Sequence, residues 1–197
     1  MSTVPELVIE EVRSPSTASV AVAPTVAFSS IPLKGASEKA THMISITSES
    51  SKSLADFRSS LSGAAWDVYV SKLGKYIKSS RSSAGKDLYS VNGGTANPIG
   101  QAWVFKVDNA AANTFVTAFG KLMKSIKFDG SVGVGQIIHG TDNGESMYVY
   151  ATYADLNTAF NFGAKNDSEA KAFSTFSETV KGSDLSKTFT RVLIKRY

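Results

Sequence analysis

The spacing of apolar side chains is clearest in the second half of the chain, where it predicts strands that alternate with helices. Residues 101–107, QAWVFKV, are mostly large and apolar, which is typical of a strand. In residues 108–128 the apolar side chains recur every three or four positions and predict a helix with one buried face. The positions that form this apolar stripe are Phe115, Phe119, Leu122, Met123 and Ile126.

A hairpin and a second helical pattern follow. Residues 131–140 and 145–154 have the pattern of two strands, and Asn143-Gly144 between them favours a tight turn. The remaining elements that we expect are a short helical turn over 155–162, a helix over 167–182 and a final strand over 187–197. The order strand, helix, strand, strand, helix, strand is that of a ferredoxin-like domain. Its two helices cover one face of the sheet, and the other face needs a cover.

The first half of the chain repeats this pattern weakly and supplies a candidate cover. The expected strands are 6–12, 26–35, 41–50 and 85–91, and the expected helices are 53–61 and 64–80. In the second of these helices Trp66, Tyr69, Leu73 and either Tyr76 or Ile77 share one face. The first helix of the pattern has no counterpart, because residues 14–24 are short and hold two prolines. Residues 79–86 and 91–100, rich in serine, glycine and asparagine, are expected to be loops.

These patterns predict an α+β protein that arose by a diverged tandem duplication. We expect two ferredoxin-like βαββαβ repeats, the first of them degenerate, whose antiparallel sheets pack face to face as a pseudo-dimeric α/β barrel. The predicted boundaries are 1–92 for the first repeat with an extended N-terminal arm, 93–100 for a linker, and 101–197 for the second repeat.

Three segments carry a resemblance to a known superfamily. They are AWVFKVDNAAANTFVTAFGKLM, QIIHGTDNGESMYVYATYADL and FTRVLIKRY. In the spacing of their apolar residues they resemble the dimeric α/β-barrel proteins of antibiotic-biosynthesis-monooxygenase type. The resemblance covers residues 101–197 well and 4–92 loosely. It implies two sheets that close a barrel, and an activity among those of small monooxygenases, haem-degrading enzymes, isomerases and proteins without known activity.

Composition and charge exclude several classes of function. The absence of cysteine excludes disulfides, thiolate metal sites and cysteine nucleophiles. The net charge of +4 is mild and the basic residues are scattered, so nucleic acid is not an expected partner. We find neither the pattern of a signal peptide nor an apolar run long enough to span a bilayer. We therefore expect a soluble cytoplasmic protein without a membrane partner, or a protein of a virion.

Two histidines are the candidates for proton chemistry. His139 stands where a strand meets the hairpin and would serve as the catalytic acid or base near a barrel mouth. His42 begins the matching strand of the first half and would line the same ligand site. The alternative for both is an ordinary residue at a strand edge. No metal-ligating spacing is present, so we expect no metal and no cofactor, although one histidine could ligate haem.

Aromatic side chains are the candidates for ligand binding. Tyr148 and Tyr150 share one strand face because side chains alternate along a strand. Together with Trp103 they would line an aromatic pocket between the sheets. The alternative is ordinary packing between sheets or under helices.

Three functions fit these features. The first is binding of a small, mostly apolar or aromatic molecule, without catalysis. The second is a cofactor-free monooxygenase or isomerase of the resembling superfamily, in which His139 handles protons while Trp103 and Tyr148 position the ring. The third is a structural or assembly subunit, for example of a phage particle, that associates with itself or its neighbours through the N-terminal arm.

Overall fold

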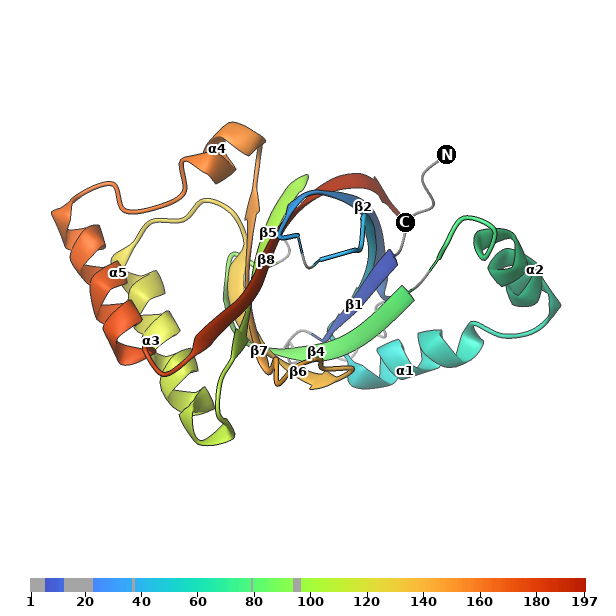
Figure 1. Ribbon diagram of the computed structural model, residues 1–197, viewed down its shortest axis with the longest axis horizontal. Coiled ribbons are helices and arrows are strands. Elements are labelled where there is room, and N and C mark those ends of the chain that lie inside the picture. The colour runs from blue at the N-terminus through green and yellow to red at the C-terminus, as the bar shows by residue number, and fades with distance from the viewer. Residues whose placement is uncertain (1–5, 13–22, 37, 79, 94–96) are drawn as a thin grey trace.

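The chain folds into a closed β-barrel with helices on two opposite sides (Figure 1). The computed structural model describes residues 6–12, 23–36, 38–78, 80–93 and 97–197, and for 6–12 the backbone alone. Eight strands follow one another around the barrel in the order β1-β3-β2-β8-β5-β7-β6-β4. Their bounds are β1 Glu6–Val12, β2 Thr25–Lys34, β3 His42–Ser48, β4 Ser80–Val91, β5 Ile99–Lys106, β6 Val132–His139, β7 Met147–Tyr153 and β8 Asp184–Arg196. The α+β class and the barrel expected from the sequence are confirmed.

The helices divide between the two halves of the chain. They are α1 Ser51–Ser60, α2 Ala64–Leu73, α3 Ala112–Ser125, α4 Leu156–Phe160 and α5 Asp167–Thr179, with a short 3₁₀ turn, η1, at Asn109–Ala111. Figure 1 shows α3 and α5 side by side against the outside of the barrel, and α1 and α2 on the opposite side. The helices expected over 108–128 and 167–182 are therefore present, and each is shorter than expected.

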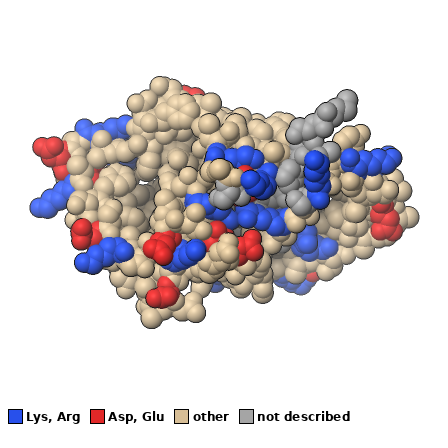
Figure 2. All heavy atoms as spheres, in the orientation of Figure 1, with Lys and Arg blue, Asp and Glu red and all other residues tan. Residues whose placement is uncertain are grey.

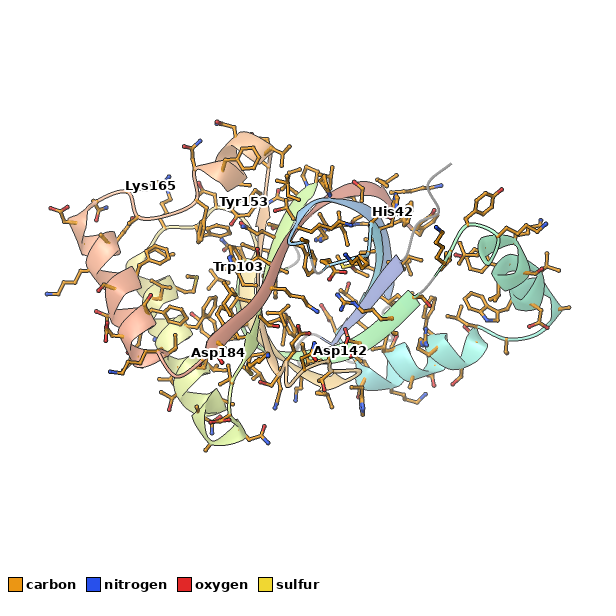
Figure 3. All side chains as sticks on the ribbon, in the orientation of Figure 1. His42, Trp103, Asp142, Tyr153, Lys165 and Asp184 are labelled. Carbon is orange, nitrogen blue, oxygen red and sulfur yellow. The ribbon has the colours of Figure 1, made fainter. Side chains whose placement is uncertain are left out.

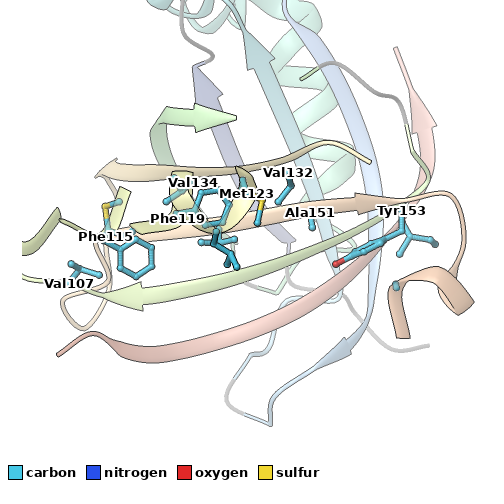
Figure 4. Close-up of a cluster of buried hydrophobic side chains, with 13 residues drawn as sticks. Val107, Phe115, Phe119, Met123, Val132, Val134, Ala151 and Tyr153 are labelled. Carbon is cyan, nitrogen blue, oxygen red and sulfur yellow. The ribbon is translucent and has the colours of Figure 1, made fainter. Parts of the chain in front are cut away.

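The apolar stripe of α3 forms the main core, between the helices and the outer face of the sheet (Figure 4). Phe115 is 1% exposed, and its ring lies 5.1 Å from Phe105 on β5 and 5.6 Å from Phe176 on α5. These centroid distances suit favourable tilted and edge-to-face contacts. Val132, Val134 and Ala151 supply the sheet side of the same core. The side chains that alternate with them on β6 and β7 must therefore point into the barrel.

The hairpin between β6 and β7 has the turn that its sequence predicts. Asn143 and Gly144 have φ values of 53° and 77°, and the Glu145 amide donates to the Asp142 carbonyl at 2.9 Å. Positive φ at both central residues belongs to the tight hairpin turn whose twist matches the flanking strands. This prediction is confirmed.

The expectation of purely antiparallel sheets is wrong for the first strand. β5 runs antiparallel to its neighbours β7 and β8, whereas β1 runs parallel to β3 and β4. In the second half α3 crosses between β5 and β6, so these two strands run in the same direction. The segment between β1 and β2 is short and contains prolines, which disfavours a crossover helix. Without a crossover, β1 runs antiparallel to β2 and therefore parallel to β3.

Two further expectations for the first half are wrong. Most of residues 79–86, expected as a loop, belong to β4, because β1 and β6 on either side bind its backbone and make side-chain hydrophobicity unnecessary. The helix expected over 64–80 ends at Leu73, and its apolar face is not buried against a sheet, since Tyr69 is 43% exposed and Tyr76, beyond the helix end, is 69% exposed. The strand expected over 6–12 is confirmed. It pairs with β3 and β4 of its own chain, while much of the rest of the expected N-terminal arm lies outside the described residues.

Candidate functional site: a cavity inside the barrel

The barrel encloses a cavity of about 210 Å³. A small apolar cluster inside the barrel contains Ile31, Met43, Val104 and Phe189, and the last three also line the cavity. The cavity is lined by residues from β2, β3, β4, β5, β6, β7 and β8. A polar and aromatic lining of this kind is typical of a site for a small molecule.

The register of the second-half strands explains why space remains. Around the inner wall Phe189, Ala102, Tyr150 and Gly133 lie next to one another on β8, β5, β7 and β6. In the next row Gly100 lies between Arg191 and Thr152. Large side chains on β7 and β8 thus alternate with small ones on β5 and β6. The cavity is open where β5 carries only a hydrogen or a methyl group.

The two tyrosines of β7 converge on one buried carboxylate. Tyr148 and Tyr150 donate hydrogen bonds to the two carboxylate oxygens of Asp87, at 3.0 and 2.9 Å. Asp87 lies on β4 and is 2% exposed. Both rings pass over glycines: a Cβ atom at Gly135 would lie 2.2 Å from Cζ of Tyr148, and one at Gly133 would lie 2.7 Å from the Tyr150 ring. These two hydrogen bonds to one buried side chain fix both phenol groups in the cavity wall.

A second polar group lies at the end of the barrel away from the hairpin. A Cβ atom at Gly100 would lie 2.6 Å from Nε of Arg191, so the Arg191 side chain lies across β5 at this position. Next to Gly100, the Thr152 hydroxyl accepts from the Ser131 amide at 3.0 Å and from the Asn97 side chain at 3.3 Å. Ser131 is 2% exposed, and within the described part of the chain its hydroxyl has no hydrogen-bond partner.

Ion pairs occupy the hairpin end of the cavity. Arg81 pairs with Glu38 and lies 3.6 Å from the Asp142 carboxylate. The Lys187 ammonium lies 2.8 Å from Glu145, which also accepts from the Ser186 hydroxyl at 2.8 Å. Both glutamates are buried, so their partners are needed to offset desolvation. Figure 2 shows Lys and Arg side chains gathered over the middle of one face, where Figure 1 shows the barrel.

The structure brings two of the sequence-predicted site residues together and separates the others. Tyr148 and Tyr150 line the cavity. Trp103 lies on the outer face of β5, 5.9 Å from the Phe162 ring and toward α3 and α5 (Figure 3). His42 stacks on Phe28 at 5.3 Å and lines an outer groove beside α2. His139 is exposed at the end of β6.

Sequence reasoning missed most of the polar residues of this site. Asp87, Arg191 and Ser131 were not among the candidates. One signal was present for Asp87. It lies inside the expected strand 85–91, on the same face as Gly85, and a carboxylate buried in a strand needs hydrogen-bond donors on a neighbouring strand. The alternation of Gly133 and Gly135 was the matching signal for large rings on β7. Nothing in the pattern singled out Ser131.

Tyr153 differs from the two cavity tyrosines because it lies on the outer face of the sheet (Figure 3). Burial raises the pKa of the Tyr153 hydroxyl well above its ordinary value. This hydroxyl donates to Gln101 Oε1 at 3.3 Å. Asp155, the residue that caps α4, has its pKa lowered by the hydrogen bond from the Thr158 amide.

Neither a metal centre nor a membrane-spanning helix is found in the described residues. Within these ranges no cluster of three His, Asp or Glu side chains could hold a metal ion. No helix among them is long and apolar enough to cross a bilayer.

Solved structures with a similar fold include three proteins of low sequence identity. An anthrone oxidase-like protein has a TM-score of 0.54 and 11% identity, over 88% of this chain and 78% of its own. A candidate monooxygenase from Lactobacillus acidophilus NCFM has a TM-score of 0.51 and 15% identity, over 87% and 78%. Another from Fusobacterium nucleatum has a TM-score of 0.52 and 11% identity, over 89% and 79%. No protein-family model and no curated protein matches the sequence. These likenesses establish a related α/β fold and leave the activity open.

Proposed function

We propose that the barrel cavity binds a small aromatic molecule that carries oxygen substituents. The observation that carries this proposal is the free space beside the small side chain of Ala102, between Phe189 and Tyr150 on the inner wall. A flat ring placed there would meet aromatic side chains on both sides, which adds to the gain from burial. A cavity of about 150 Å³ in a protein interior binds benzene. The 210 Å³ found here therefore suits one or two rings.

The polar lining is the reason for expecting oxygen substituents. The cavity is lined by Ser45 and Thr47 on β3, which lies across the barrel from β7. A purely apolar ligand would displace water from these groups and offer no hydrogen bonds in return. This consideration narrows the mostly apolar ligand expected from the sequence to an oxygenated aromatic one.

We also infer that the barrel descends from a duplicated ferredoxin-like unit of the antibiotic-biosynthesis-monooxygenase type. In support, the strands of the two halves follow equivalent orders, β4-β1-β3-β2 and β8-β5-β7-β6. If β1 to β4 are equated with β5 to β8, the pairing of β2 with β8 corresponds to the pairing of β6 with β4, and these two pairings join the halves. The reversed β1 is the trace of the lost first helix. The repeat limits remain 1–92 and 101–197.

A second candidate function is oxidation of a phenol or an anthrone-type compound by molecular oxygen without a cofactor. The hydrogen bond from Tyr148 to Asp87 favours it, because a ligand hydroxyl beside Tyr148 would be linked to a buried carboxylate that can accept a proton. The names of the structural neighbours agree with such chemistry. Oxygen consumption with anthrone tests it: we expect turnover by the wild type and a loss of at least about 100-fold in Tyr148→Phe. Equal rates in both proteins would remove this candidate.

Isothermal titration with 2-naphthol tests the binding function. We expect saturable binding to the wild type and none to Ala102→Phe, in which the new ring fills the cavity. Trp103→Phe is the matched control, because Trp103 adjoins Ala102 but faces outward. Circular dichroism verifies folding, and Ser45→Phe fills the cavity from β3 if Ala102→Phe does not fold. No binding to the wild type, or unchanged binding to both filled variants, contradicts the proposal.

A further inference from the structure

We infer that the ligand of this cavity is an aromatic carboxylate, held between the Arg191 guanidinium and the Ser131 hydroxyl at the end of the barrel away from the hairpin. The inference rests on the proposed function and names the chemical class of the ligand. It follows from three features of the cavity: the path of Arg191, the unpartnered Ser131 hydroxyl, and the distribution of charge along the lining.

The path of the Arg191 side chain depends on Gly100. Arg191 and Gly100 are cross-strand partners, and a Cβ atom at Gly100 would lie 2.6 Å from Nε and 2.8 Å from Cζ of the arginine. The guanidinium group therefore lies over β5, against the inner wall of the cavity. Thr152 is the next residue along this row, one strand spacing of about 4.8 Å away. Glycine at position 100 thus directs a cation toward the polar group around Thr152.

Ser131 supplies a hydroxyl that can donate to a ligand. The residue is 2% exposed and lines the cavity, and its hydroxyl has no partner among the described residues. Its amide is already bonded to Thr152, which also accepts from the Asn97 side chain. A buried hydroxyl without a partner is costly, and an acceptor on a ligand removes that cost. The guanidinium group over Gly100 and the Ser131 hydroxyl thus lie on opposite sides of Thr152, and we place the acceptor group of the ligand between them.

The charges along the cavity lining point to an anionic group at this end. Among the residues whose side chains the structure describes, four basic ones line the cavity, namely Arg81, Lys187, Arg191 and Arg196. The acidic residues in the described part of the lining, Asp142 and Glu145, belong to the hairpin end, where Arg81 and Lys187 bind them. In the described part of the lining, Arg191 and Arg196 are the charged side chains at the far end. A guanidinium group forms two parallel bonds with a planar carboxylate, which a neutral phenol cannot match.

The ring and the carboxylate then fit along the length of the cavity. Arg191 and Gly100 form the row next to Phe189 and Ala102 on the inner wall, since Arg191 lies two residues after Phe189 on β8 and Gly100 two residues before Ala102 on β5. A carboxylate at Arg191 places the attached ring over Ala102, next to Tyr150. The aromatic ring therefore keeps the position at Ala102 given under the proposed function, and the carboxylate reaches from there toward Arg191.

A comparison of 2-naphthoate with 2-naphthol near neutral pH tests the inference by isothermal titration. We expect naphthoate to bind the wild type about 10-fold more tightly than naphthol, the gain expected from a charged pair of hydrogen bonds. Arg191→Met should remove that preference and leave naphthol binding within about twofold. Lys195→Gln is the control, because it removes one charge from the exposed end of the same strand.

The outcomes separate this inference from the proposed function. If naphthol binds as tightly as naphthoate, or if Arg191→Met keeps the preference, the carboxylate inference is overturned while the aromatic site stands. If neither compound binds the wild type, or if Ala102→Phe and Ser45→Phe bind both unchanged, the proposed function fails and the inference fails with it. If Lys195→Gln removes the preference as Arg191→Met does, the effect is one of general charge and the inference is wrong.

Discussion

The Tyr148 ring lies against its cross-strand partner Gly135 so closely that a Cβ atom on the glycine would come within 2.2 Å of Cζ. On its other side Gly135 pairs with Asp87 of β4, and the Asp87 carboxylate accepts a hydrogen bond from the Tyr148 hydroxyl. One missing side chain therefore lets a phenol cross β6 and reach a carboxylate on β4. This arrangement fixes one wall of the cavity.

Gly135→Ala should displace the Tyr148 ring and lower the free energy of unfolding by about 1–3 kcal/mol, the usual cost of overpacking. Urea denaturation measures the change. Gly182→Ala is the control, because nothing lies within 4 Å of the added carbon and its backbone is outside the left-handed region. Equal stability of the two variants would show that the ring does not need the glycine.

Asp87→Asn should lower the free energy of unfolding by about 1–3 kcal/mol. The amide offers one acceptor oxygen where the carboxylate offers two, so one of the two tyrosine hydroxyls faces an NH₂ group to which it cannot donate. Asp184→Asn, at an exposed strand end, provides the comparison in the same urea titration. A variant at position 87 as stable as the control would mean that these hydrogen bonds contribute nothing.

Tyr153 should make the protein less stable in alkali. Burial raises its pKa in the folded state, so above pH ~10 the unfolded chain releases this proton while the folded chain keeps it. The unfolded state then binds fewer protons, and stability falls with rising pH by about 1.4 kcal/mol per unit from this group. Below pH ~10 the contribution is fully present. Unfolding measured between pH 9 and about 11.5 should show a smaller slope for Tyr153→Phe. Parallel curves for the two proteins would contradict this assignment.

Ser131→Ala should weaken naphthoate binding about 3-fold to 10-fold and leave the unliganded protein as stable as before, or slightly more so. The hydroxyl has no partner within the described residues, so its removal breaks no bond until a ligand is present. Isothermal titration and thermal unfolding of the same sample measure the two effects. A large loss of stability together with unchanged affinity would assign the hydroxyl to the fold.

The sequence allowed the second half of the fold to be predicted because two periodicities are strong there. Helical spacing from Phe115 to Met123 marked the buried face of α3, and alternation from Met147 to Tyr153 marked β7. The first half was harder to predict. β4 is rich in serine, and its strand conformation comes from neighbours on both sides, which no local pattern reports.

The candidate site was predictable only where alternation along one strand sufficed. Tyr148 and Tyr150 share a face by that rule, and the same rule leaves open which face is inside the barrel. Trp103 has the same apolar character as a lining residue, but it lies on the face covered by α3 and α5. Arg191 and Asp87 enter the site through pairings of strands far apart in the chain, β5 with β8 and β4 with β6.

The most direct test of the central claim, that the ligand site is inside the barrel, is an NMR titration of protein labelled at its tyrosine rings. The chain has seven tyrosines, and they sample both the cavity and the exposed face of α2. On addition of 2-naphthoate, the resonances of Tyr148 and Tyr150 should shift and saturate together, while those of Tyr69 and Tyr76 stay unchanged. Shifts confined to Tyr69 and Tyr76 would place the ligand in the groove outside the barrel and contradict the claim.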